Sequence, residues 1–481
     1  MSPNYNLRSN TLYALTGGFV IGILGLARTF LVAHTLPPDD LGEWSLLQLI
    51  LVYTGFCHLG VAVAMPNEIV AREALDDRNG SKELAHSGLT LILGTGILVA
   101  AACLILPREI IGGTLAKYRV LFALTFLAQQ SFLYIAALLR GLMRFQLIAL
   151  GQVVFGAGSI LMMAYLLPIM GVRGALVAMF AGNLTAACVG GGVIQRYGYK
   201  VVPLASLKFL FVAGFPLLIS ALIGTGLQNI DRVLVGRLLG KQSLGYYSVS
   251  NVFIMPVMFL PSVLGGLLMT HFSRAAVMES DGMVKDHLLR FSWAVAIVLA
   301  IVTACIYMAS GGIIRQFIPK YQSSLLTVRI LLVGSYFYAS TLVLANFLIA
   351  NKRQIGLLWV QGASLTILGG LCLLAIMAGA SYEGVGWANL VTYFIYFLML
   401  AVYAKHAMGW DLSFAGRMMA SFLVPFGYMA GSYYLCRPLE QKWASGSIFH
   451  WSFFLHLALL AGSGLPMALA AVRHARRPSP V

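Results

Sequence analysis

The amino-acid sequence predicts an all-α, polytopic integral membrane protein with about fourteen transmembrane helices. Hydrophobic residues make up 59% of the 481-residue chain and charged residues only 10%, which is far too apolar for a water-soluble globule. The apolar residues also fall into successive runs of about 20, the length that an α-helix needs to cross a bilayer. We therefore expect two six-helix lobes followed by two additional C-terminal helices.

Charges, prolines and glycines separate the apolar runs and give the predicted spans in order. The first, 11–35, is too long for the apolar core of a signal peptide, so we expect an uncleaved helix. The N-terminal lobe (1–208) continues with spans 42–65, 85–106, 118–139, 146–168 and 174–195. The C-terminal lobe (209–404) holds spans 209–236, 243–269, 290–311, 325–350, 355–379 and 385–404, and the segment 405–481 adds spans 415–436 and 447–471 with a cytoplasmic tail.

The distribution of basic residues predicts the orientation of the chain. An even number of spans leaves both termini on one side of the membrane, and Lys and Arg accumulate in cytoplasmic loops. Placing the N-terminus and the 66–84 loop in the cytoplasm gives about 19 basic residues inside and about 11 outside. We expect both termini to be cytoplasmic. Because the net charge of +16 is spread over loops that face anionic lipid, we expect no nucleic-acid partner.

The two halves of the chain share a helix–loop–helix segment. The segment 28–50 is echoed by 229–253, and at an offset of 203 residues the matching pairs include Val32 with Val235, Leu36 with Leu239 and Gly42 with Gly245. Since each copy would contain an even number of helices, both copies insert in the same orientation. This arrangement is a parallel repeat about an axis along the membrane normal, which usually encloses a site at the interface of the copies.

Ionisable residues inside predicted spans are the first candidates for function, because they are costly in a bilayer. Arg28 lies about five residues, or roughly 8 Å, beyond the middle of the first span. An arginine at this depth suits an anion in a hydrated cavity. The alternative is that its long side chain extends to the outer interface.

Five further residues complete the predicted substrate-binding candidates. Asp231 and Arg232 lie near the outer end of span 209–236, where they contact substrate or serve as an interfacial or structural pair. His58 has a proton-linked role or packs through a hydrogen bond. The intramembrane amides, among them Gln152 and Gln361, bind sugar hydroxyls or join neighbouring helices.

Other classes of site are not indicated. The six cysteines are scattered without metal-binding or redox spacing, and the glycine clusters lack the strand and loop of a phosphate-binding motif. We expect no catalytic residue, no metal and no cofactor. Asp39, Asp40 and Glu43 are expected in an acidic outer loop, and Tyr247 in the aromatic belt at a membrane interface.

Two motifs resemble those of the polysaccharide and O-antigen flippases of the multidrug/oligosaccharidyl-lipid/polysaccharide export superfamily. The first is Leu36 followed by LGEWSL (Leu41 to Leu46), and the second is DRVLVGRLLGKQSLGYYSV (Asp231 to Val249). The resemblance covers about residues 8–472. The chain departs from the family at His58, where an acidic residue is common, and in Met269 to Arg274, which lacks the usual proline. These departures put an inherited ion-coupling scheme in doubt.

The resemblance implies a V-shaped pair of lobes that moves a polyprenyl-diphosphate-linked glycan across the bacterial cytoplasmic (inner) membrane by alternating access. The product would serve surface polysaccharide or exopolysaccharide synthesis, such as the O-antigen of lipopolysaccharide. The expected partners are that glycan, membrane lipid and polysaccharide polymerase or export proteins. A cation-coupled drug antiporter is the nearest alternative, although span 11–35 lacks the carboxylate it would need. A membrane-embedded glycan polymerase or ligase is disfavoured by the short outer loops.

Overall fold

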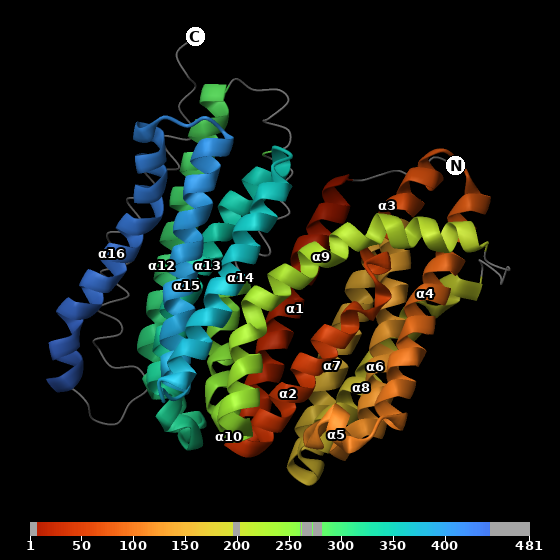
Figure 1. The fold of residues 1–481 in the computed structure, drawn as a ribbon, viewed down its shortest axis with the longest axis horizontal. Coiled ribbons are helices and arrows are strands. Elements are labelled where there is room, and N and C mark those ends of the chain that lie inside the picture. Colours follow the sequence, from red (N-terminus) through yellow and green to blue (C-terminus); the bar gives the residue numbers. More distant parts are fainter. Residues whose placement is uncertain (1–6, 196–202, 260, 262–271, 273–280, 443–481) are drawn as a thin grey trace. The chain divides into compact units, whose positions relative to one another are not determined.

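The computed structural model describes residues 7–195, 203–259, 261, 272 and 281–442 (Figure 1). Helices and the short turns between them account for these residues, and no strand occurs among them. The predicted all-α class is therefore confirmed. The chain divides into two compact units, Met1–Asn229 and Ile230–Val481. The division into predicted lobes at residue 208 stays a prediction.

Unit 1 consists of helices connected by short turns. Their bounds are α1 (Leu7–Thr35), α2 (Pro38–Gly55), the 3₁₀ turn η1 (Phe56–His58), α3 (Val61–Ala74), α4 (Arg78–Ile105), α5 (Arg108–Ile111), α6 (Gly113–Gly141), α7 (Phe145–Met170), α8 (Val172–Gln195) and the larger part of α9 (Leu204–Leu234). The start of α4 is set by the Asp77 carboxylate, which accepts a hydrogen bond from the backbone N–H of Gly80 at 2.9 Å. Such an N-cap satisfies a backbone donor that the helix itself leaves unpaired.

Unit 2 begins at the end of α9 and has the same all-helical character. It contains the π-helical turn η2 (Val235–Leu239), α10 (Gly240–Ser248), a short apolar helix (Ser250–Phe259), α12 (Asp281–Phe317), the 3₁₀ turn η3 (Pro319–Ser324), α13 (Leu325–Ala350), α14 (Gln354–Met377), α15 (Tyr382–Ala407) and α16 (Leu412–Lys442). The start of α15 is capped by Ser381, whose hydroxyl oxygen accepts from the backbone N–H of Glu383.

The lengths and composition of the helices identify a multi-pass membrane protein. In the described part of the chain nine helices are long and apolar enough to cross a bilayer, or ten if the bent pair α2–α3 is one span. Large apolar side chains such as Leu98 and Leu161 remain 70% and 72% exposed, as expected for helices that face lipid. The predicted span 447–471 lies outside the described residues. The total of fourteen spans therefore stays a prediction.

The predicted continuous span 42–65 is broken. Helix α2 ends at Gly55, and α3 starts at Val61 after a bend of 43°. Leu59 and Gly60 adopt left-handed backbone conformations with φ of 53° and 81°. Gly60 also packs directly on Gly214 of α9, because a Cβ at Gly60 would lie 1.9 Å from the Gly214 carbonyl oxygen. The close backbone contact and the positive φ both require glycine at position 60, and the left-handed pair Leu59–Gly60 ends the helical path.

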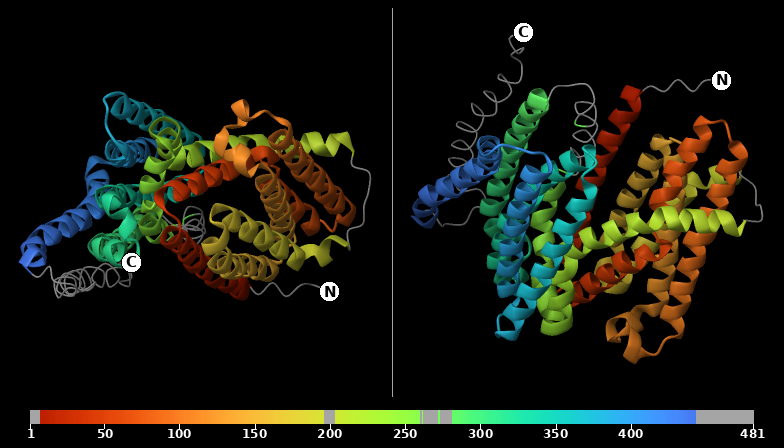
Figure 2. Two further views of the ribbon diagram at one scale, coloured as in Figure 1. Left: turned by 90° about the horizontal axis from the view of Figure 1, so that it is seen from below. Right: turned by 45° about the horizontal axis from the view of Figure 1, so that its top comes forward.

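The order of neighbouring helices is the same in the two units. In unit 1, α8 packs on α6 and α7, and α4 packs on α6; in unit 2, α15 packs on α13 and α14, and α12 packs on α13 (Figures 1 and 2). In unit 1 an apolar core forms where α3, α4 and α6 meet, around Met65, Ile92 and Leu138. The repeated packing order is consistent with a duplicated helical unit, and the parallel orientation of the two copies stays a prediction.

Candidate functional site

Arg28 lies on α1 against the aromatic face of Phe155 on α7. Its guanidinium carbon is 5.3 Å from the centre of the Phe155 ring, and its side chain is half-buried. Among the described residues no carboxylate forms an ion pair with it. The cation–π contact stabilises the guanidinium by only about 1 kcal/mol. This is less than the cost of placing a charge in the membrane, so another group is needed to balance Arg28. A guanidinium in this state favours an anion, and its planar fork fits a phosphate.

The packing of α7 on α1 and α6 holds Phe155 in place. Its ring stacks on that of Phe132 of α6 with a centroid distance of 6.2 Å. Gly156, the next residue, allows α1 to approach, because a Cβ there would lie 2.8 Å from the side chain of Leu24. The surface under Arg28 is therefore rigid, and its aromatic character is fixed by α7.

Gln152 lies three residues before Phe155 on α7, a spacing that places both side chains on one helix face. The amide is half-buried, and it makes no hydrogen bond to any other described residue. The side chains of Arg28, Phe155 and Gln152 thus combine a cation, an aromatic surface and an amide. These groups suit an anionic ligand that also carries hydroxyl groups, and among the predicted candidates Arg28 has the clearest anion-binding chemistry.

Asp231 occupies the last turn of α9 and is buried within unit 2. Its carboxylate accepts hydrogen bonds from the Tyr247 hydroxyl at 2.6 Å, the Asn389 amide at 2.8 Å and the backbone N–H of Arg232 at 2.8 Å. These bonds connect α9 with α10 and α15. Three donors offset part of the cost of burying a carboxylate, so Asp231 joins the helices of unit 2. Arg232, the next residue, is half-buried.

Gln361 also joins two helices of unit 2. Its side-chain amide on α14 donates to the hydroxyl of Tyr396 on α15 at 3.3 Å. The Tyr396 ring lies 6.1 Å from that of Tyr338 on α13. In this structure the amide thus makes an interhelical hydrogen bond, the second of its two predicted roles.

His58 lies at the break between α2 and α3. Its ring is buried, and Nδ1 accepts a hydrogen bond from the backbone N–H of Gly60 at 3.0 Å. The bond satisfies a donor freed by the left-handed turn at Leu59 and Gly60. His58 therefore stabilises the break, whereas Arg28 and Asp231 each lie within a long helix.

Glu43 is the buried acidic group that sequence reasoning missed. It was predicted in an outer loop, but α2 starts at Pro38 and buries Glu43 to 5% exposure. Its Oε2 atom accepts from the Lys117 ammonium and the Tyr118 hydroxyl of α6, both at 2.8 Å. Tyr247 is likewise buried within the protein, and its hydroxyl donates to Asp231. The partners of Glu43 lie more than 70 positions away in sequence, which is why local composition gives no sign of the pairing.

The chemistry of these groups is that of binding. Among the described residues no three histidine, cysteine, aspartate or glutamate side chains lie close enough to hold a metal ion. Unit 1 offers a cation beside an aromatic ring and an amide, and unit 2 offers a hydrogen-bonded carboxylate. The arrangement in unit 1 suits an anionic ligand.

Comparison with solved structures shows the fold. The lipid II flippase MurJ in an inward closed conformation matches with a TM-score of 0.73 and 14% identity, covering 97% of this chain and 100% of that one. An inward-facing multidrug resistance MATE family transporter of the MOP superfamily matches with a TM-score of 0.67 and 12% identity, covering 83% and 98%. A MOP superfamily transporter from Pyrococcus furiosus has a TM-score of 0.53 and 14% identity, covering 83% and 94%.

Comparison with known sequences shows the family. No curated protein matches the chain. Residues 7–272, more than half of the sequence, match the family described as "Polysaccharide biosynthesis protein". The match includes both motifs on which the predicted resemblance rests. The chain belongs to the polysaccharide biosynthesis protein family.

Proposed function

We propose that the protein is a flippase that moves a polyprenyl-diphosphate-linked glycan across the bacterial inner membrane by alternating access, with both termini in the cytoplasm. The family and the fold support a transporter and give no support to an enzyme. The glycan would be used for surface polysaccharide or exopolysaccharide, of which O-antigen is one kind. Polymerase and export proteins would be its partners on the product side.

The observation that carries the proposal is Arg28. A diphosphate lipid needs a cation in the membrane that binds its phosphates without being neutralised by a carboxylate. Arg28 meets this condition among the described residues, because its contact is with the ring of Phe155. Gln152 on the same face of α7 would hydrogen-bond the first sugar or a phosphate oxygen. Anion recognition would then be concentrated in unit 1.

A complementation experiment tests the proposal. A strain lacking the gene should accumulate lipid-linked oligosaccharide on the cytoplasmic side and lose surface glycan, and the intact gene should restore export. We expect Arg28→Ala to restore less than about a tenth of export, because the variant loses one or two charge-assisted hydrogen bonds to the substrate. Arg28→Lys, which keeps the charge but not the planar fork, should restore part of it.

The matched control is Arg417 on α16. Its guanidinium lies 5.8 Å from the centre of the Phe414 ring, so it makes the same kind of contact from an exposed position in unit 2. Arg417→Ala should export normally. Normal export by Arg28→Ala, at wild-type abundance, would refute the assigned role of Arg28.

A cation-coupled drug antiporter is the second candidate function, and Asp231 is the observation that favours it. A buried carboxylate is a group through which a cation can be coupled to transport. The deletion strain separates the two functions. Drug sensitivity with normal surface glycan would support the antiporter, whereas loss of surface glycan with unchanged drug sensitivity would support the flippase.

A further inference from the structure

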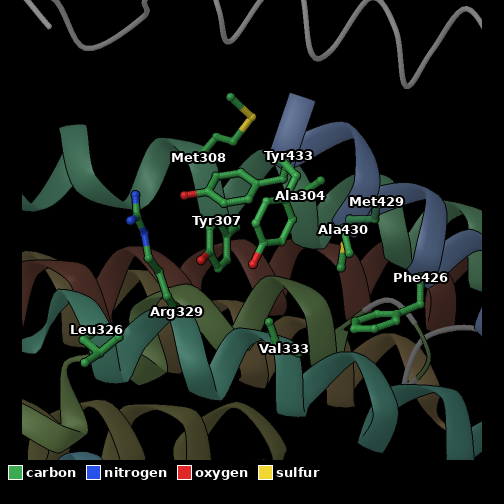
Figure 3. Close-up of a pocket in the computed structure, with 11 residues that line it drawn as sticks. Ala304, Tyr307, Met308, Leu326, Arg329, Val333, Phe426, Met429, Ala430 and Tyr433 are labelled. Carbon is green, nitrogen blue, oxygen red and sulfur yellow. The ribbon is translucent and has the colours of Figure 1, made fainter. Parts of the chain in front are cut away.

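Unit 2 contains a cavity that none of the residues considered so far lines. It has a volume of about 380 Å³ and lies between α12, α13 and α16 (Figure 3). Its walls combine apolar side chains, including Val333 and Phe426, with Tyr307, Tyr433 and one cation, Arg329. The size is that of a site for a small molecule or part of a lipid.

Arg329 is the polar centre of this cavity. Its guanidinium carbon lies 5.0 Å from the centre of the Tyr307 ring, and that ring meets the Tyr433 ring edge-on at 4.9 Å. The Nε atom of Arg329 is buried and has no hydrogen-bond partner. No carboxylate among the described residues pairs with this side chain. A buried, unsatisfied guanidinium donor is costly, and an anion in the cavity would satisfy it.

A second arginine lies close to the first. A Cβ built on Gly311 would be 3.6 Å from Nη2 of Arg329 and 3.9 Å from Nη2 of Arg315. Both guanidinium groups therefore approach the same glycine, which has no side chain to separate them. Arg315 is exposed and, in the described part of the chain, has no ion-pair partner. Two like charges held together without a carboxylate favour a bound anion.

The position and the walls of the cavity indicate the source of that anion. Arg329 lies in the second turn of α13, about 6 Å along the axis from its first residue. It shares the cavity with Tyr307 and Tyr433, residues of a type that is enriched where membrane helices meet lipid head groups. A free phosphate would leave Leu326, Val333 and Phe426 without apolar contact, whereas the carbons next to a lipid phosphate would cover them. The hydroxyls of Tyr307 and Tyr433, which line the cavity together with Arg329, add donors for phosphate oxygens.

We propose that this cavity binds one membrane phospholipid. The phosphate would lie against Arg329 and Arg315, and the glycerol and first acyl carbons would pack on the apolar wall formed with α16. The bound lipid would hold α16 against α12 and α13. The cavity shares no residue with the site around Arg28. A negative result for lipid binding would therefore leave the proposed transport function untouched.

Native mass spectrometry of the delipidated full-length protein in detergent tests the proposal. Wild-type protein should bind one phosphatidylglycerol per chain and melt at a higher temperature with it. Arg329→Gln should weaken binding at least about tenfold, since a charge-assisted pair is lost, and should abolish the rise in melting temperature. Arg315→Gln should weaken it about threefold, because that side chain is exposed. Arg417→Gln, the matched exposed arginine on α16, should bind like wild type.

Further arms separate the possible sources of the anion. Diacylglycerol with the same acyl chains should bind at least about tenfold more weakly, and millimolar inorganic phosphate should not displace the phospholipid. If Arg329→Gln fails to fold, the binding measurement uses Arg329→Lys and Arg315→Gln instead. Arg329→Lys keeps the charge of the side chain. Binding unchanged by every arginine substitution, equal binding of diacylglycerol, or displacement by inorganic phosphate would each overturn the proposal.

Discussion

Helices α1 and α9 begin the two predicted repeats, and the aligned position in each carries opposite charge. At the offset of 203 residues that aligns Val32 with Val235, Arg28 aligns with Asp231. Asp231 is buried and accepts three hydrogen bonds from donors of unit 2. Arg28 is half-buried, and its guanidinium makes a cation–π contact with the ring of Phe155.

The difference teaches that two matching positions can be held in different ways. In α9 the charged group takes part in packing, since its removal would leave the Tyr247 and Asn389 donors without their acceptor. In α1 the charged group contacts an aromatic ring, and under the proposed function it binds the substrate. The following predictions test this contrast, from the largest expected effect on stability to the smallest.

Gly60→Ala tests how α9 is anchored in unit 1. The new Cβ would collide with the Gly214 backbone, and alanine would be strained at a φ of 81°. We expect a loss of about 3 kcal/mol or more in the free energy of unfolding, measured by denaturation in detergent. Gly94→Ala on α4 is the control, because nothing lies within 4 Å of its Cβ. Equal stability of the two variants would refute the close contact.

Asp231→Ala tests whether the carboxylate of α9 is structural. It leaves the hydroxyl of Tyr247 and the amide of Asn389 without an acceptor, so we expect a loss of about 3 kcal/mol. Asp231→Asn keeps one acceptor oxygen and should lose about 1 kcal/mol. The same denaturation measurement checks both variants. Wild-type stability of Asp231→Ala would show that packing does not depend on this group.

A pair of tyrosine substitutions compares the buried carboxylates of the two units. Tyr247→Phe removes a donor to Asp231, and Tyr118→Phe removes a donor to Glu43, which keeps the Lys117 ammonium at 2.8 Å. We expect losses of about 2 and about 1 kcal/mol respectively. Parallel melting curves measure them. A larger loss for Tyr118→Phe would contradict the view that Lys117 compensates for the missing hydroxyl.

Hydropathy predicted the fold well because the cost of exposing backbone to lipid forces apolar runs into helices. The predicted span 118–139 lies within α6, and the predicted span 355–379 corresponds to α14. The break at Leu59 and Gly60 could not be predicted in the same way. It depends on contact with Gly214, more than 150 positions away, and an apolar Leu-Gly pair carries no local sign of a turn.

The candidate site was predictable only in part. Arg28 and Asp231 stand out in the sequence because charge is rare inside spans. Their surroundings do not, since Phe155, Tyr247 and Asn389 are ordinary residues of membrane helices until the fold brings them close. Glu43 was misplaced because it lies near Asp39 and Asp40, whereas the pairing with Lys117 that buries it joins α2 to α6.

Substitution of Arg28 should have the smallest effect on stability. Arg28→Ala removes a cation–π contact worth about 1 kcal/mol and relieves the cost of an unpaired charge. We expect the free energy of unfolding to change by less than about 1 kcal/mol. A loss as large as that of Asp231→Ala would show that Arg28 is a packing residue too, and the contrast between α1 and α9 would fail.

The most direct test of the central claim is translocation of a fluorescent polyprenyl-diphosphate oligosaccharide in vesicles reconstituted with purified protein. Wild type and Arg417→Ala should move the lipid at the same rate, and Arg28→Ala at least about tenfold more slowly, with its fold intact. Arg28→Lys should fall between them. Translocation by Arg28→Ala at the wild-type rate would contradict the claim that unit 1 recognises the diphosphate through Arg28.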